Sequence, residues 1–172
     1  KSIRKTSNQC KNEISARYYK TKAGRKDIMT KEQLGTLIIA SQETMYRVAK
    51  TLLRSDADCA DAIQEAIVKA FSGLHTLRRD SYAKTWLIRI VINECYAILR
   101  REKRLISLDD VTLAQEAKER GDYSDLYEAV SRLPDEIRLT VTLFYMEGYR
   151  IKEIAALMKT TESAVKNRLM RA

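Results

Sequence analysis

The sequence predicts an all-α protein built from two small helical domains joined by an acidic linker. The chain has 172 residues with one Pro and five Gly, which are too few turn-forming residues for a many-stranded sheet. From Leu34 onward, its apolar residues recur at the spacing of amphipathic helices. Residues 107–131 hold seven acidic residues against two basic ones and separate two mildly basic blocks.

Residues 1–28 form a separate basic segment, with nine Lys and Arg against two acidic residues and no apolar stripe. Such a composition is typical of a disordered arm, or of a tail that grips nucleic acid. We favour a third interpretation, in which this is a non-native extension upstream of a start at Met29. Met29 leads directly into an amphipathic helix, and Gly24-Arg25-Lys26 is what a translated purine-rich ribosome-binding stretch would encode.

Three helices are expected in the first domain, residues 29–106. The first starts near Leu34, and the second follows the acidic N-capping sequence Asp56-Ala57-Asp58. A polar loop, residues 73–82, leads to a third helix over about 83–103 that ends in a basic cluster. The residues expected to face the core are Leu37, Ile38, Met45, Val48, Ala49 and Leu52 in the first helix, Ala60, Ile63, Ile67, Ala70, Phe71 and Leu74 in the second, and Trp86, Leu87, Ile90, Val91 and Ile98 in the third.

The second domain, residues 123–172, follows a linker over 107–122. A helix over 123–132 is expected first, and it ends at Leu133-Pro134. The last helical pattern carries no C-cap signal, so we expect its helix to be truncated at Ala172. Three shorter helical patterns fill this domain after the proline, over 135–146, 150–158 and 161–172.

The last two patterns have the layout of a helix-turn-helix. After a polar turn, Thr160 or Thr161 can cap the second helix, and Glu162 places a carboxylate in its first turn. A helix with a polar, basic outer face fits the DNA major groove, where side chains meet base edges and cations neutralise phosphates. The pattern alone is equally consistent with two solvated surface helices. The side chains expected to face outward are Ser163, Lys166, Asn167, Met170 and Arg171.

The residue content argues against an enzyme or a metal protein. His75 is the single histidine, and the three Cys form no C-x-x-C pair, so neither a metal cage nor a His-dependent hydrolase site is expected. The chain has no Gly-rich phosphate loop and no nucleophile elbow. No apolar run has the length of a membrane span, and no secretory signal is present. The sequence therefore predicts a cytoplasmic protein without catalytic residues, metals or cofactors.

A further pattern runs through the C-terminal domain: Leu133-Pro134, Arg138, Val141, Leu143, Gly148, Ile151, Glu153-Ile154-Ala155 and Val165-Lys166-x-Arg168-Leu169-x-Arg171-Ala172. These residues resemble region 4 of bacterial sigma factors, most closely the extracytoplasmic-function (ECF) group. Family members usually have Gly-Thr where this chain has Ser163-Ala164, which leaves the base preference open. The resemblance implies that the last helix reads the −35 promoter element through Ser163, Lys166, Asn167, Arg168, Met170 and Arg171.

In the first domain, Asp61-x-x-Gln64-Glu65-x-x-x-Lys69-Ala70-Phe71 resembles region 2.2 of the same family. Asp61, Gln64 and Glu65 have the i, i+3, i+4 spacing that places them on one helical face. By themselves they are consistent with an ordinary solvated acidic face. The resemblance implies that this face docks on the coiled coil of the polymerase β′ subunit.

The stretch Trp86-Leu87-x-x-Ile90-x-x-Asn93 resembles the region 2.3–2.4 helix, which opens and reads the −10 element. Trp86 is equally consistent with a core residue. The cations near the C-terminus of this helix are also consistent with a structural role, in which they only stabilise the helix dipole. The family often has an Asp where this chain has Ala97, so any role of that carboxylate is in doubt. The residues implied in −10 contacts are Arg78, Arg79, Tyr82, Trp86, Arg89, Asn93, Arg100, Arg101, Lys103 and Arg104.

Together the two resemblances imply an alternative sigma factor. Such a protein binds core RNA polymerase through the β′ coiled coil and the β flap, and directs promoter-specific initiation. It is commonly held inactive by an anti-sigma factor, often a membrane-anchored one, and the acidic linker suits a mobile tether. One alternative is a stand-alone helix-turn-helix regulator that binds duplex DNA without polymerase, and another is a purely structural helical adaptor. The stand-alone regulator leaves the Asp61 face and the Trp86 helix unexplained.

Overall fold

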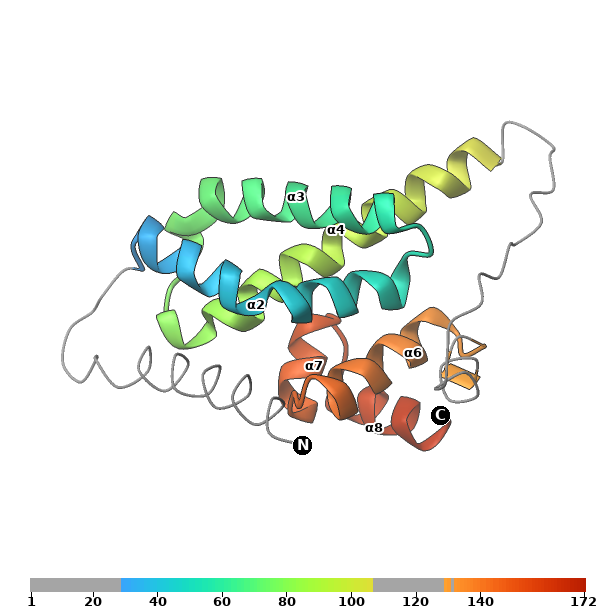
Figure 1. Ribbon diagram of the computed structural model, residues 1–172. Coiled ribbons are helices and arrows are strands. Elements are labelled where there is room, and N and C mark those ends of the chain that lie inside the picture. The colour runs from blue at the N-terminus through green and yellow to red at the C-terminus, as the bar shows by residue number, and fades with distance from the viewer. Residues whose placement is uncertain (1–28, 107–128, 131) are drawn as a thin grey trace, which may run out of the picture.

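The computed structural model describes residues 29–106, 129–130 and 132–172. Within those ranges the regular elements are helical and no strand occurs, which confirms the predicted all-α fold. The basic segment 1–28, the linker 107–122 and most of the predicted helix 123–132 lie outside the described residues. Figure 1 shows two groups of helices, α2–α4 and α6–α8, that pack against each other.

Helix α2 (Lys31–Leu52) begins at a capping box. The Thr30 hydroxyl accepts a hydrogen bond from the Gln33 backbone N–H (3.3 Å), and the Gln33 side chain accepts one from the Thr30 N–H (3.0 Å). These two bonds satisfy backbone donors that have no partner within the helix. The core residues predicted for this helix are confirmed, since none of Leu37, Ile38, Met45, Val48, Ala49 and Leu52 is more than 8% exposed.

Helix α3 (Asp56–Gly73) packs through small side chains. Its N-cap is Ser55, whose hydroxyl accepts from the Asp58 N–H (3.3 Å), so the predicted cap at Asp56 is wrong by one residue. Small side chains at a helix contact allow the two helix axes to approach closely. The buried residues of α3 are Cys59, Ala62, Ala66 and Ala70.

The predicted apolar stripe of α3 is wrong at Ala60 and Phe71. Ala60 is exposed, and Phe71 is 37% exposed. The buried face is rotated relative to the prediction, because Ala62 and Ala66 occupy its centre and carry little hydropathy signal. The remaining predicted positions, Ile63, Ile67, Ala70 and Leu74, are half-buried or buried.

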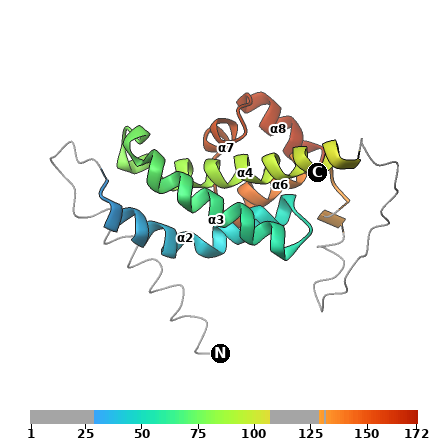
Figure 2. The same ribbon diagram turned by 90° about the horizontal axis from the view of Figure 1, so that it is seen from above.

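The predicted loop contains two short 3₁₀ turns, Leu74–Thr76 and Asp80–Tyr82. Helix α4 (Ala83–Ile106) follows and confirms the third predicted helix. Figure 2 shows α4 between α3 on one side and α7 and α8 on the other. Of its predicted core residues, Leu87 and Val91 are fully buried, whereas Trp86, Ile90 and Ile98 are half-buried.

The second group starts with α6 (Asp135–Val141), which runs directly into a single π turn, η3 (Thr142–Met146). Gly148 follows at φ +69°, in the left-handed region that favours glycine, and the Tyr149 N–H bonds to the Leu143 carbonyl (2.9 Å). This turn reverses the chain and leads it toward the helix-turn-helix.

The predicted helix-turn-helix consists of α7 (Ile151–Leu157) and α8 (Glu162–Met170). The Thr161 hydroxyl accepts from the Ala164 N–H (3.1 Å), so Thr161 is the cap of the second helix. Lys159 lies at φ +51°, and the Thr160 N–H bonds back to the Ala155 carbonyl (2.9 Å). That arrangement is the Schellman type of helix end, in which glycine is the usual residue at the left-handed position.

Replacing Lys159 by glycine should raise the free energy of unfolding by up to about 1 kcal/mol. The left-handed conformation costs an L-residue roughly 1–2 kcal/mol. Glycine avoids this cost, but it loses more backbone entropy on folding, which offsets part of the gain. Lys166→Gly in the interior of α8 is the matched control, and it should lower stability by about 1 kcal/mol. Urea unfolding followed by circular dichroism measures both, and an equal decrease in stability in the two variants would contradict the prediction.

Candidate nucleic-acid interface

Most of the residues predicted to contact the −10 element are exposed on α4 and on the loop before it. Helix α4 turns Leu87, Ile88, Val91, Ile92 and Cys95 into the interior, and its other residues are half-buried or exposed. The basic residues near the C-terminal end of α4 lie in its last turns, which are exposed. The exposed members of the predicted set are Arg78, Arg79, Tyr82, Asn93, Arg100, Arg101, Lys103 and Arg104.

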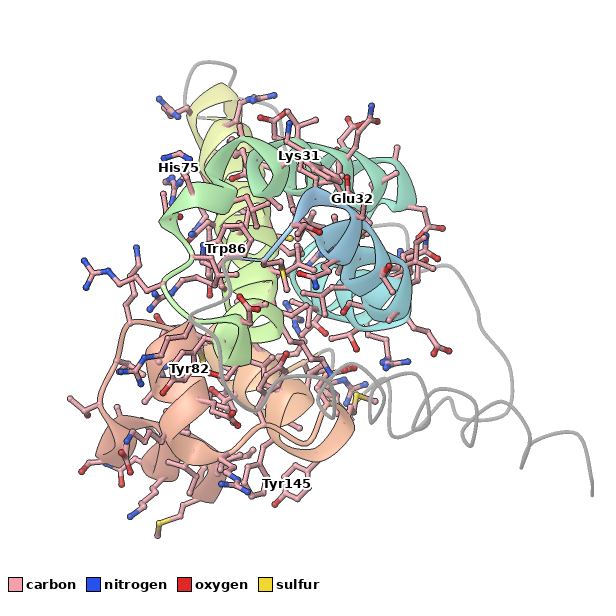
Figure 3. All side chains as sticks on the ribbon, turned by 90° about the vertical axis from the view of Figure 1, so that its left-hand side faces the viewer. Lys31, Glu32, His75, Tyr82, Trp86 and Tyr145 are labelled. Carbon is pink, nitrogen blue, oxygen red and sulfur yellow. The ribbon has the colours of Figure 1, made fainter. Side chains whose placement is uncertain are left out.

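Trp86 and Arg89 are the half-buried members of that set. The Trp86 ring lies beside Gly73 at the end of α3, where a β-carbon would be 3.7 Å from its Cζ2. Figure 3 shows His75, Trp86 and Tyr82 along the same side of the molecule. Trp86 thus packs on the end of α3 and keeps part of its surface accessible. The Arg89 guanidinium donates to the Ala156 carbonyl in the second helical group.

The outer face of α8 carries the polar side chains that the sequence predicts for it. The buried residue of this helix is Val165, which sets the direction of its inner face. The residues on the opposite face reach solvent and have the composition expected of a groove-binding helix. They are Ser163, Lys166, Asn167, Met170 and Arg171, and Met170 is 85% exposed.

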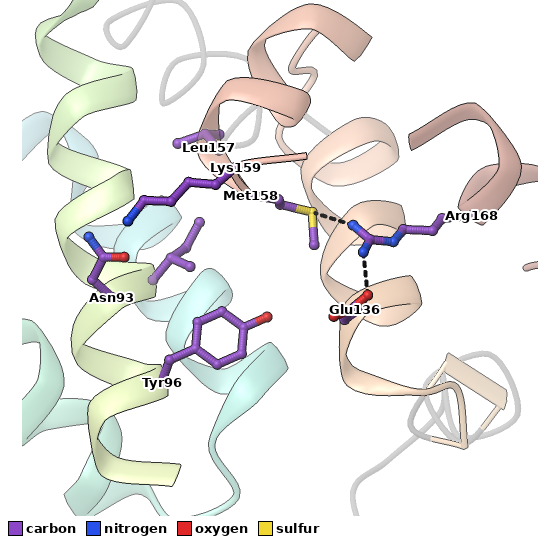
Figure 4. A pocket seen from close by; sticks show the side chains of 8 residues that line it. Asn93, Tyr96, Glu136, Leu157, Met158, Lys159 and Arg168 are labelled. Carbon is purple, nitrogen blue, oxygen red and sulfur yellow. Dashed lines mark hydrogen bonds and ion pairs between the residues drawn. The ribbon is translucent and has the colours of Figure 1, made fainter. Parts of the chain in front are cut away.

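Arg168 does not share this outward face. Its side chain is 20% exposed, and its guanidinium pairs with the Glu136 carboxylate on α6. The same group lies 3.9 Å from the Met158 sulfur in the turn of the helix-turn-helix, as the dashed lines in Figure 4 show. Sequence reasoning assigned Arg168 to DNA, because nothing in the local pattern reveals a carboxylate 32 residues away. Its observed contacts hold α8 against α6.

The face of α3 that carries Asp61, Gln64 and Glu65 is exposed. In Figure 1, α3 lies on the side of the molecule away from α7 and α8. The same outer surface includes Val68 (57% exposed) and Phe71 (37% exposed), at successive helical spacings from Asp61. Large apolar side chains beside acidic ones are typical of a protein-binding surface rather than of a nucleic-acid one. The sequence feature that could have indicated this protein-binding surface is the apolar residue Val68, which falls outside the predicted apolar stripe of α3.

Lys69 connects this face to α4. Its ammonium group is 2.6 Å from a Glu94 carboxylate oxygen on α4 and 3.4 Å from Glu65 on its own helix. The hydrogen bond to Glu94 raises the pKa of Lys69 above its ordinary value, so the ammonium stays charged. This pair therefore joins α3 to α4 at the surface, next to Asn93.

The chemistry of the described residues offers neither a metal cluster nor a reactive thiol. Across residues 29–106, 129–130 and 132–172, no group of three His, Cys, Asp or Glu residues is placed to hold a metal ion. Cys59 and Cys95 are free thiols and fully buried, and desolvation raises the pKa of Cys95 to about 12. In that same part of the chain, no helix has the length and apolar character needed to cross a membrane.

Comparisons with known proteins agree on one family. The family descriptions that match are Sigma-70 region 2, over residues 37–105, and Sigma-70 region 4, over residues 123–172. The chain is 32% identical over 146 residues to the RNA polymerase sigma factor SigV of Bacillus subtilis, covering 83% of this chain and 88% of the relative. It is 34% identical over 131 residues to the ECF RNA polymerase sigma factor SigM of Mycobacterium tuberculosis, covering 74% and 67%. The chain belongs to the ECF group of sigma factors.

The fold of this sigma factor is shared by a solved relative. The sigma factor RpoE of Bartonella quintana, crystallised in complex with the anti-sigma factor NepR, superposes with a TM-score of 0.69 at 22% identity, covering 82% of this chain and 89% of that chain. Helices α2–α4 contain the region 2 match, and α6–α8 lie within the region 4 match. The family and the two-domain helical fold predicted from the sequence are confirmed. Helices α2–α4 thus form region 2 and α6–α8 belong to region 4.

The buried thiols of the sigma factor should be inert in the native state. In a Cys10→Ser variant, we expect no fast reaction with a disulfide reagent such as DTNB at pH 8, and two reactive thiols after unfolding in urea. Burial blocks access and disfavours the thiolate, which is the reacting species. A fast native reaction would show that region 2 opens.

The raised pKa of Cys95 also predicts that the free energy of unfolding falls as the pH rises from about 9 toward 12, because the unfolded chain loses the Cys95 proton at a lower pH than the folded chain.

Proposed function

We propose that this chain is the promoter-recognition subunit of a bacterial RNA polymerase, with α8 on the −35 element, α4 on the −10 element and α3 on the polymerase itself. The observation that carries the proposal is that one chain of this family presents two polar, basic helix faces and, apart from them, an acidic and apolar face. The basic faces suit phosphates and base edges, and the third face suits a protein partner.

On the −35 element, the outer face of α8 supports contacts in the major groove. Lys166 and Asn167 lie near the middle of the helix and are exposed, so they are placed to meet base edges. Asn has the paired donor and acceptor that match adenine, and Lys matches the acceptor atoms of guanine. Arg171, at the end of the helix, suits a phosphate. Arg168, on the inner side of α8, positions this face by pairing with Glu136 on α6.

On the −10 element, the loop before α4 supports capture of an unstacked base. Tyr82 is 58% exposed and offers a stacking surface, and Arg78 and Arg79 are exposed beside it in the sequence. The exposed cations from Arg100 to Arg104 extend a positive track along the last turns of α4. Such a track suits the phosphates of a single strand.

The exposed α3 face supports docking on the coiled coil of the β′ subunit, and region 4 is proposed to reach the β flap. An anti-sigma factor is proposed to block these surfaces, and the crystallised complex of RpoE with the anti-sigma factor NepR supports a partner of that class. The acidic segment 107–122 is proposed to tether the two regions at variable separation. Catalysis then belongs to core polymerase, and the protein itself needs no cofactor and acts in the cytoplasm.

The polymerase assignment is tested by gel filtration with core RNA polymerase. The chain should co-elute with core enzyme, and Asp61→Lys and Glu65→Lys should each weaken co-elution about ten-fold while the helical circular dichroism signal stays intact. Gln42→Lys, which adds positive charge to the exposed side of α2, is the control and should co-elute normally. A chain that binds duplex promoter DNA tightly but never core enzyme would instead be a stand-alone regulator.

The promoter assignment is tested by run-off transcription. Lys166→Ala should reduce initiation from a −35-dependent promoter about five-fold or more, because removing a base or phosphate contact costs about 1–3 kcal/mol. Lys31→Ala removes an exposed lysine at the start of α2 and should transcribe normally. Normal transcription by Lys166→Ala would refute the assigned face of α8.

A further inference from the structure

We infer that Met170 makes this chain select a thymine within the −35 element, one or two base pairs from the adenine that suits Asn167. The Met170 side chain packs on the C5 methyl group of that thymine in the major groove. The inference rests on the proposed function, because it names the bases that the outer face of α8 distinguishes.

The inner side of α8 determines which way Met170 faces. Val165 is fully buried, and Arg168 and Leu169, three and four residues later, are half-buried on the same side of the helix. Positions 163, 166, 167 and 170 repeat at the same helical spacing on the opposite side, and all four are exposed. Met170 therefore lies on the same face as the two side chains proposed to meet base edges.

Met170 is the most exposed large apolar residue in the described part of the chain, at 85% exposure. Another methionine of the helix-turn-helix shows the contrast. Met158, in the turn, is half-buried, and its sulfur lies 3.4 Å from the Thr140 hydroxyl on α6. Apolar side chains stabilise a fold through the surface they bury, so Met170 contributes little to the packing of α8 and is available to a bound partner.

The charge around Met170 favours nucleic acid over protein as that partner. Lys166 and Asn167 precede it on the outer face and Arg171 follows it, so its side chain emerges among cationic and amide groups. The exposed apolar residues on the outer face of α3 lie instead beside acidic ones. An apolar group among cations suits the major groove, where phosphates border the base edges.

The base edges in the major groove carry one apolar group, the C5 methyl group of thymine. The other atoms exposed there are hydrogen-bond donors and acceptors, which lose their bonds to water when an apolar side chain covers them. A methionine in the groove therefore favours thymine and disfavours the other bases. Its unbranched, flexible side chain can adjust to the position of the methyl group.

The distance between Asn167 and Met170 determines how far apart the two selected bases lie. Three residues rise about 4.5 Å along an α-helix, whereas neighbouring base pairs are about 3.4 Å apart. The two side chains therefore reach base pairs that are one or two steps apart. Because the paired donor and acceptor of Asn match adenine, the outer face of α8 should select an adenine and a thymine at that spacing.

A selection experiment tests this base preference. The full chain is combined with core RNA polymerase to form the holoenzyme, and it transcribes a library of promoters with randomised −10 and −35 elements, each marked by a transcribed barcode. We expect the recovered −35 elements to share a thymine one or two base pairs from an adenine. Met170→Ala should lose the preference for the thymine and keep that for the adenine, and Asn167→Ala should do the reverse.

The decisive measurement removes only the methyl group. Deoxyuridine replaces the selected thymidine in the promoter duplex, which deletes the C5 methyl group and leaves every hydrogen-bonding atom of the base in place. We expect the wild-type holoenzyme to bind the deoxyuridine duplex about four-fold more weakly, which is the factor for one buried methyl group. The Met170→Ala holoenzyme should bind the two duplexes equally.

Met146→Ala is the matched control. Met146 is another exposed methionine of region 4, but it lies in η3 and not on α8. The Met146→Ala holoenzyme should distinguish thymidine from deoxyuridine as the wild type does. Deoxyuridine placed at a thymidine outside the promoter elements controls for effects on the duplex itself.

A second variant changes the selected base instead of removing the preference. Met170→Gln replaces the apolar side chain with a polar one of similar length, and Gln has the paired donor and acceptor that match adenine. The base selected at this position should therefore change from thymine to adenine. Because Met170 is exposed, the circular dichroism signal and co-elution with core polymerase should stay as in the wild type.

The outcomes separate this inference from the proposed function. Equal binding of the thymidine and deoxyuridine duplexes by the wild type, or unchanged discrimination by Met170→Ala, would overturn the role of Met170. Loss of co-elution with core polymerase by Met170→Ala, with its base preference unchanged, would assign Met170 to a protein interface and overturn the inference as well. A wild-type chain that recovers no promoter at all would instead count against the proposed function.

Discussion

The burial of α4 on two sides is the constraint on which the rest of the structure depends. Leu87, Val91 and Cys95 are fully buried in the core of region 2, and Ile92 is buried where α4 meets region 4. Packing on two faces sets the rotation of the helix about its axis, and this decides which of its remaining positions face solvent. Asn93, beside the buried Ile92, is therefore directed to the surface.

The small residues of α3 make that burial possible. Cys59, Ala62, Ala66 and Ala70 bring the backbone of α3 close to α4, and the Lys69–Glu94 pair joins the two helices at the surface. The outer side of α3 is then left with acidic and apolar residues, while the outer sides of α4 and α8 are basic and polar. The molecule therefore separates a surface suited to protein from two surfaces suited to nucleic acid, and it does so within a few helices.

Sequence reasoning succeeded where a side chain's environment follows from its helical period. The stripe of α2 was predicted residue by residue, and Thr161 was one of two predicted caps for α8. It failed for Ala60 and Phe71, because alanine is compatible with either face of a helix. The apolar stripe of α3 was therefore predicted one residue away from the face that is buried. Residues 1–28 and the linker 107–122 stay predictions, since they lie outside the described residues.

The sequence by itself determined the helices α2 to α4, the cap of α8, the helix-turn-helix and the family, because all of these depend on residues within a few turns of each other. Only the tertiary structure decided where Arg168, Arg89 and Glu147 point. Their partners are Glu136, the Ala156 carbonyl and Arg47, at separations of 32 to 100 residues. Arginine and glutamate are read as surface residues from local pattern, because in isolation their charge favours water. A fold that supplies a distant opposite charge or a helix-end carbonyl reverses that preference, and it thereby turns exposed charges into contacts between helices.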